Sequence, residues 1–323
     1  MTFPVSMTHW CMLRRTVLAA TGSIGCTAML RPSILFSAQA TRPIGAEVVP
    51  WHELWNGRDL RGWETWLGRP HPSVPGLPLE RDSLGQYVGP VGLGKDPRGV
   101  YTVVRLGGER LLRISGEVFG ALTSTQEFSD FHLRVEWRWG NLRWPPRQAE
   151  RRDSGLLYHC TDEHGASGPS RNWMRSLECQ IQERDCGDLW VLGGAIADSR
   201  ARLGTDAAHG DTPAWLYDAK GIAVTVPEPA TASSVLPKAT GTLEPRVRRS
   251  VDHERPAGQW NIMEVLVQGD EAEHRVNGKT VLRLTGARLA GEPLTQGKLQ
   301  IQSEGAEIYF RRIALRGLAA RRR

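Results

Sequence analysis

The chain has 323 residues, and its 41 Lys and Arg against 35 Asp and Glu give a formal net charge of +6. A mild positive excess without a clustered basic patch does not indicate nucleic acid as a partner. No membrane span is predicted either, because a spanning helix needs about 20 consecutive apolar residues.

The first 40 residues have the three parts of a signal peptide. Arg14-Arg15 precede an apolar, small-residue run from Val17 to Leu30, and Ala38-Gln39-Ala40 supplies a cleavage site. The paired arginines are typical of the twin-arginine export route. We therefore predict a twin-arginine signal peptide at 1–40 and a mature protein that is exported, either periplasmic or extracellular.

Residues 41–318 predict a single domain of short strands. Apolar and polar side chains alternate, as in strands that bury one face, in residues 131–139, 154–160, 175–182, 260–268, 298–303 and 307–315. Asn277-Gly278 predicts a two-residue hairpin turn. Because helical periodicity is almost absent, the predicted fold class is an all-β sandwich or barrel.

Two stretches predict long loops, namely 68–99, with many Gly and Pro, and 219–258, with Pro, Ala, Ser and Thr. The Arg-rich end, 319–323, predicts a frayed tail. Without the signal peptide an odd number of cysteines remains, which permits at most one disulfide: Cys160, Cys179 and Cys186. The first two can equally be small buried side chains.

A polar sheet face is the most informative feature of the sequence. Alternation places Glu178, Gln180 and Gln182 in one row, and the preceding strand adds Asp153 and His159. The strand near the C-terminus adds its own polar side chains, Gln300, Gln302 and Glu304. Such a face is costly to bury without hydrogen bonds, so it either faces solvent or lines a groove for a polyhydroxylated ligand.

Two further patterns relate this face to carbohydrate. The chain has 12 Trp, whose ring planes suit the apolar faces of sugars, and Trp190 lies near a loop. Glu178, Gln180 and Glu183 stand at the offsets of the E-x-D-x-x-E motif of laminarinase-type β-glucanases. That motif needs a second acid where this chain has Gln180, which argues against a retaining glycosidase mechanism.

Blocks of sequence along nearly the whole mature chain have a familiar order: Leu54–Trp63, Glu127–Trp139, Asp153–Cys160, Ser176–Glu183, Gly187–Trp190, Trp260-Asn261, Val276–Gly278 and Gly297–Arg311. In these blocks the sequence resembles the 3-keto-disaccharide hydrolase domain family. The resemblance implies a jelly-roll β-sandwich of two antiparallel sheets, of the concanavalin A-like lectin/glucanase type.

The resemblance also implies cleavage of glycosides that carry a ketone at carbon 3. The ketone acidifies the hydrogen on carbon 2, a base removes it, and the group on carbon 1 is eliminated before water adds back. This chemistry needs a base, an acid, and a positive side chain or a metal ion beside the enolate oxygen.

We predict three catalytic residues: Glu178 as the first candidate for the base, His159 as base, acid or metal ligand, and Asp153 as an orienting or ligating group. The predicted substrate-binding residues are Gln180, Gln302, Glu304, Trp190 and Arg134. No His/carboxylate spacing requires a metal, so a divalent cation remains an alternative to a positive side chain.

Two other function classes stay open at this point. A non-catalytic, lectin-like carbohydrate-binding domain would use the same groove without a base. A laminarinase-type hydrolase would act on unoxidised sugar. Carbohydrate is the expected partner in all three cases, and the sequence does not indicate an oligomeric state.

Overall fold

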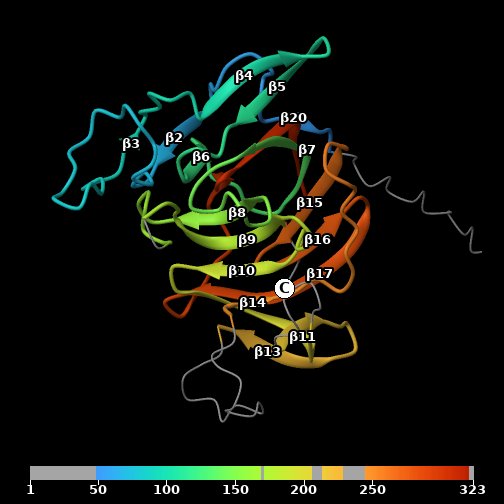
Figure 1. Ribbon diagram of the computed structural model, residues 1–323. Helices are drawn as coiled ribbons and strands as arrows, with labels where there is room; N and C mark the ends of the chain where they lie inside the picture. Colours follow the sequence, from blue (N-terminus) through green and yellow to red (C-terminus); the bar gives the residue numbers. More distant parts are fainter. Residues whose placement is uncertain (1–48, 169–170, 206–212, 228–243, 320–323) are drawn as a thin grey trace, which may run out of the picture. The chain divides into compact units, whose positions relative to one another are not determined.

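Two antiparallel sheets make up the computed structural model, which describes residues 49–168, 171–205, 213–227 and 244–319 (Figure 1). These described residues contain no helix and fall within one compact unit. The predicted signal peptide, 1–40, lies outside them, as do residues 320–323 of the predicted tail.

The larger sheet has 12 strands. They are β1 (His52–Glu53), β4 (Tyr101–Leu106), β5 (Glu109–Ile114), β7 (Phe131–Arg143), β11 (Ala195–Thr205), β12 (Pro213–Tyr217), β13 (Ile222–Val226), β15 (Asn261–Gln268), β16 (Glu271–Val276), β17 (Lys279–Leu289), β18 (Glu292–Pro293) and β20 (Ala306–Gly317). Its main path runs β12-β11-β17-β16-β15-β7-β20-β5-β4.

The smaller sheet has eight strands, in the order β14-β10-β9-β8-β19-β6-β2-β3. They are β2 (Trp63–Leu67), β3 (Gly92–Leu93), β6 (Gly120–Ser124), β8 (Asp153–Thr161), β9 (Arg175–Gln182), β10 (Leu189–Leu192), β14 (Arg246–Val247) and β19 (Lys298–Ser303). In Figure 1, β8, β9 and β10 run side by side in yellow-green.

The main hydrophobic core lies between the two sheets. Leu177, Cys179 and Ile181 of β9 belong to it and are fully buried, as are Val135 and Trp137 of β7. Burying one large apolar side chain contributes about 1.5–3 kcal/mol. This inward set fixes the direction of the alternate side chains, so the polar residues of β9 lie on the face of the smaller sheet that points away from the larger one.

The predicted all-β sandwich of two antiparallel sheets is confirmed, and every alternating segment forms a strand. The Asn277-Gly278 hairpin is confirmed as well, since both residues have positive φ, 49° and 77°. Asn277 does more than turn the chain. Its Oδ1 accepts a hydrogen bond of 2.9 Å from the backbone N–H of Ile262, and its Nδ2 donates one of 2.8 Å to the carbonyl of His253.

The two predicted loops depart from plain loops in different ways. Segment 68–99 has little regular structure, but Val74, Tyr87 and Val91 are buried in the main core. Segment 219–258 contains β13 and β14, so a long loop over this whole range is wrong; its residues 228–243 lie outside the described part. β14 matters for the site because it is paired with β10.

The three cysteines of the described region are free and buried, which agrees with the small-side-chain interpretation. No helix in the described region is long and apolar enough to cross a membrane.

Candidate functional site

The polar face of the smaller sheet is buried rather than solvated. Glu178 is 4% exposed, Gln180 5% and Gln302 1%. Antiparallel pairing places Gln180 opposite Gly155 and Glu178 opposite Leu157, so the side chains of three adjacent strands meet on one face. The core lies behind these side chains, and their polar groups face a cavity.

A cavity of about 1080 Å³ lies over this face. Its lining includes predicted site residues from β8, β9, β10 and the end of β19: Asp153, Glu178, Gln180, Trp190, Gln302 and Glu304. The structure therefore brings together six of the eight residues that the sequence singled out. The other two, His159 and Arg134, do not line it.

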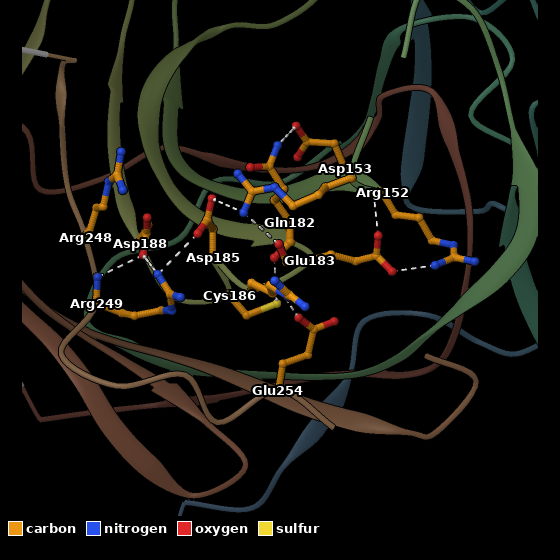
Figure 2. Close-up of polar contacts among 12 residues, drawn as sticks. Arg152, Asp153, Gln182, Glu183, Asp185, Cys186, Asp188, Arg248, Arg249 and Glu254 are labelled. Atoms are coloured by element: carbon orange, nitrogen blue, oxygen red, sulfur yellow. Dashed lines mark hydrogen bonds and ion pairs between the residues drawn. The ribbon is translucent and has the colours of Figure 1, made fainter. Parts of the chain in front are cut away.

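An arginine that the sequence analysis missed completes the cavity. Arg147 comes from the loop between β7 and β8; its Nη2 lies 2.5 Å from Asp153 Oδ2 and its Nη1 lies 3.3 Å from Glu304 Oε1. The Gln182 side-chain amide also donates to Asp153 Oδ2 (Figure 2). Arg147 stands among many loop arginines, so no spacing signal distinguishes it in the sequence.

Three carboxyl groups of the cavity have raised pKa values. Burial raises the pKa of Asp153 to about 7, although Arg147 and the hydrogen bond from Gln182 act in the opposite direction. Burial, followed by the nearby charge of Asp153, raises the pKa of Glu178 well above its usual range. The same two causes raise the pKa of Glu304. Arg147 alone does not offset three buried carboxyls, and strongly perturbed groups in one cavity mark a candidate functional site.

Four buried oxygens of the cavity have no hydrogen-bond partner among the described residues: Asp153 Oδ1, Glu178 Oε1, Gln180 Oε1 and Gln302 Oε1. Buried polar atoms are normally paired. A set of acceptors gathered on one wall suits a ligand that brings several donors, and the hydroxyls of a sugar do so.

The prediction that His159 shares this face is wrong because β8 is irregular there. The β8–β9 register shifts between Tyr158 and Thr161, and His159 has a left-handed φ of 54°. The break in alternation turns the ring toward Phe131 of the larger sheet, with centroids 6.4 Å apart. Burial lowers the pKa of His159 to about 4, so the ring is neutral at physiological pH.

Arg134 and Glu183 also lie elsewhere. Arg134 belongs to β7 of the larger sheet, pairs with Glu136 at 3.2 Å and does not line this cavity, so its contact with substrate stays a prediction. Glu183 pairs with Arg152 and lines a separate, smaller cavity (Figure 2). The three-residue glucanase motif is therefore not reproduced within one site.

A buried ionic cluster lies at the turn between β9 and β10. Asp185 and Asp188 are fully buried, and each carboxylate lies within 3.4 Å of Arg249 (Figure 2). Arg246 of β14 approaches the same two aspartates at 3.6 Å. The cluster attaches the short strand β14, and with it Arg246, to one end of the cavity.

Among the described residues, no three His, Cys, Asp or Glu side chains are arranged to hold a metal ion. A divalent cation at the site stays a prediction, and activity with and without a chelator would test it.

Comparison with known proteins gives one match to a family, described as the 3-keto-alpha-glucoside-1,2-lyase-like domain, over residues 50–316. No curated protein sequence matches the chain. The family match agrees with the motif blocks of the sequence and connects the chain with carbohydrate chemistry.

Solved structures that are similar to the chain have low sequence identity to it. A provisionally assigned glycosyl hydrolase from Parabacteroides distasonis ATCC 8503 is 17% identical, with a TM-score of 0.43, over 83% of this chain and 94% of that one. The carbohydrate-binding module CBM66 from Bacillus subtilis is 10% identical, with a TM-score of 0.35, over 67% of this chain and 92% of that one.

Proposed function

Because the chain belongs to the 3-keto-alpha-glucoside-1,2-lyase-like domain family, we propose that it is an enzyme that cleaves glycosides oxidised to a ketone at carbon 3. The observation that carries the proposal is the buried Asp153–Glu178–Arg147 group in a cavity lined with unpartnered acceptor oxygens. It supplies a base, an acid and a positive charge in one cavity.

The reaction is an elimination followed by a hydration. A base takes the proton from carbon 2. The electron pair of the broken C–H bond then forms an enolate with the neighbouring ketone. The enolate then expels the oxygen on carbon 1, which leaves as an alcohol once an acid has protonated it. Water adds to the resulting double bond, and the net change is hydrolysis.

We give the two carboxyl groups different roles. Asp153, with a pKa of about 7, is ionised in an appreciable fraction at neutral pH and suits the base. Burial and the neighbouring charge of Asp153 raise the pKa of Glu178 well above its usual range, so Glu178 can hold a proton and suits the acid on the leaving oxygen. This differs from the expectation from the sequence, in which Glu178 is the first candidate for the base and Asp153 is an orienting or ligating group.

The other cavity groups fit binding roles. Arg147 lies against Asp153 and offers the positive charge that an enolate oxygen requires. The side-chain amides of Gln180 and Gln302 line the cavity and suit hydrogen bonds with ring hydroxyls.

Substrates that differ in their leaving group test the assignment. We expect the wild type to cleave methyl and 4-nitrophenyl 3-keto-glucosides and to leave the unoxidised parents intact. Asp153→Asn should lose about a hundredfold or more on both, because the base is missing. Glu178→Gln should lose a similar factor on the methyl glycoside only, since 4-nitrophenolate leaves without a proton.

Two other results of this assay would contradict the proposal, and a third would extend it. Cleavage of the unoxidised sugars would indicate an ordinary glycoside hydrolase. Binding without cleavage would indicate a lectin-like domain, for which the unpartnered oxygens serve equally well. Loss of activity with a chelator, restored by a divalent metal, would add a cation to the site.

A further inference from the structure

The outer face of the larger sheet carries a row of arginine and aromatic side chains. Arg138 of β7 follows Trp137, which is buried in the core, so the Arg138 side chain points away from the smaller sheet. Tyr309 of β20 is paired with Arg138. Trp260 directly precedes β15, and the pairing of Asn261 with Trp137 puts Trp260 on the other side of Arg138. This row lies on the opposite side of the sandwich from the cavity over the smaller sheet.

The aromatic rings of the row hold two guanidinium groups. The guanidinium carbon of Arg138 lies 4.9 Å from the centre of the Trp260 ring and 5.7 Å from that of Tyr309. The guanidinium carbon of Arg311 lies 4.4 Å from the same Trp260 ring. Cation–π attraction acts within about 6 Å of a ring centre. These contacts fix the position of a guanidinium group without neutralising its charge.

Arg138 differs from its neighbours because it has no acidic partner. Glu136 lies 2.8 Å from Arg311 and 3.2 Å from Arg134, and Glu109 lies 3.8 Å from Arg311. Arg138 makes no ion pair or hydrogen bond with any other residue that the structure describes, and its Nε is buried. The residue as a whole is half-buried, so the amino groups at its tip meet solvent. Three guanidinium groups face two carboxylates, and the surplus positive charge is that of Arg138.

The strength of a single charge indicates what size of ligand fits. One exposed ion pair contributes at most about a fivefold factor in affinity, so a small free anion is held poorly. A polymer with repeated charged groups makes several such contacts at once, and their linkage raises the overall affinity. The row is open along the sheet and accepts an extended chain.

The distribution of charge on this surface favours a polymer with widely spaced anionic groups. Carboxylates of Glu136 and Glu307 lie among the arginines, and they repel a dense polyanion such as DNA, with one charge per about 1.7 Å. The two rings lie about 4.8 Å to either side of Arg138, one strand spacing, so uncharged groups flank the free charge. No exposed large apolar side chain of the described region belongs to the row, which disfavours insertion into a lipid surface.

We propose that the row Trp260–Arg138–Tyr309 binds an acidic polysaccharide. A carboxylate or sulfate group of the polymer accepts hydrogen bonds from the amino groups of Arg138, and the neutral parts of the polymer lie beside the two aromatic residues. The site holds the protein on a charged polymer and leaves the cavity of the smaller sheet free for its own ligand. This inference goes beyond the proposed function and does not depend on it.

Oligosaccharides with one charge on every second ring test the site. Hyaluronan oligosaccharides carry a carboxylate and κ-carrageenan oligosaccharides a sulfate, so the two probes distinguish the two anionic groups. Calorimetry at low ionic strength, where charges are screened least, should show binding of at least one of them and none of neutral dextran oligosaccharides. Arg138→Gln should raise the Kd about fivefold, the size of one charged contact. Arg138→Lys, which loses the planar donor fork, should also raise it and serves if the glutamine variant does not fold.

Arg312→Gln is the matched control. It removes the same formal charge from the larger sheet, but Arg312 lies 2.8 Å from Glu53 and is outside the row. The control should leave the Kd nearly unchanged. An equal loss of affinity in Arg138→Gln and Arg312→Gln would show that only net charge matters, and it would overturn the site.

Other outcomes would also overturn the site. These are no binding of either charged probe, equal binding of neutral dextran, an unchanged Kd in both Arg138 variants, and tighter binding of duplex DNA or of phosphatidylglycerol vesicles than of both oligosaccharides. Each readout is binding to the whole protein and needs no turnover. A failure of the proposed reaction is therefore distinguishable from a failure of this site.

Discussion

At the scale of single residues, Gly155 makes room for the candidate site. A Cβ atom there would lie 2.0 Å from Glu178 Oε1 and 2.3 Å from Gln302 Oε1. Non-bonded atoms cannot approach this closely. The absence of a side chain at Gly155 therefore lets two polar groups from the flanking strands meet above β8. Glycine in a strand interior otherwise weakens the strand, and here its small size serves the cavity.

We therefore expect Gly155→Ala to displace Glu178 and Gln302 and to lower kcat/KM by about tenfold or more, as small misplacements of reacting groups do. Steady-state kinetics on the 3-keto-glucoside would measure the change. Gly89→Ala is the control, because a Cβ at that position meets nothing within 4 Å. Full activity of Gly155→Ala would show that the close approach is not needed.

At the scale of elements, the segment between β8 and β9 covers part of the polar face. Its Trp173 donates from Nε1 to the Gly120 carbonyl at 3.3 Å, and the N–H of Met174 donates to Gln300 Oε1 at 3.1 Å. Both side chains join a small apolar cluster with Leu157, on the side of the smaller sheet away from the main core. This second cluster explains why the polar face is not solvated.

Trp173→Ala should remove most of that cluster. Trp173 is 6% exposed, and truncation of a buried Trp costs about 3–5 kcal/mol. Since one edge of the ring already lines the cavity, we expect a loss in unfolding free energy at the low end of this range. Urea denaturation would measure it, with Trp173→Phe as a milder control that keeps an aromatic ring but loses some volume and the indole N–H. A loss below about 1 kcal/mol would mean that the segment is held by its backbone alone.

At the scale of the whole molecule, buried histidines link the stability of the sandwich to pH. His274 of β16 lies between the sheets, where its Nδ1 contacts the Gly187 carbonyl at 3.0 Å and its Nε2 contacts the Tyr158 hydroxyl at 2.9 Å. Burial lowers the pKa of His274 to about 4, against about 6.5 in an unfolded chain. The contribution of the buried neutral ring to the free energy of unfolding is therefore complete above pH 6.5 and is lost as the pH falls toward 4.

Buried carboxyl groups change stability with pH in the opposite direction to His274. The contribution of His274 is therefore measured by comparing a variant with the wild type at each pH. The raised pKa of Asp153 makes its burial costly as the pH rises from about 4 to about 7. We expect His274→Gln to be less stable than the wild type at pH 7.5, with a difference that narrows at pH 4.5. Thermal unfolding between these values would show it, and a difference independent of pH would contradict the buried neutral ring.

Alternation along the chain is enough to predict the strands and the direction of most of their side chains. In an extended chain successive side chains point to opposite faces, so Leu177, Cys179 and Ile181 could enter the core only if Glu178 and Gln180 faced the other way. The same local logic identified the Asn277-Gly278 turn, since its two positive φ angles are a property of those two residues. The ordered blocks indicated the family, which the match over residues 50–316 confirms.

Which of these polar residues form a site depends on contacts between distant segments of the chain. The irregularity in β8 turns the side chain of His159 to the other face of the sheet. The residues of that segment do not predict it, because the register shift arises from pairing with β9. Arg134 follows the same alternation as Glu178 but belongs to the other sheet, and sheet membership depends on contacts between distant segments. Arg147, Trp173 and Arg246 reach the cavity from three separate parts of the chain. Local periodicity sets the face on which a side chain lies, whereas burial and charge at that face depend on what the rest of the chain places over it.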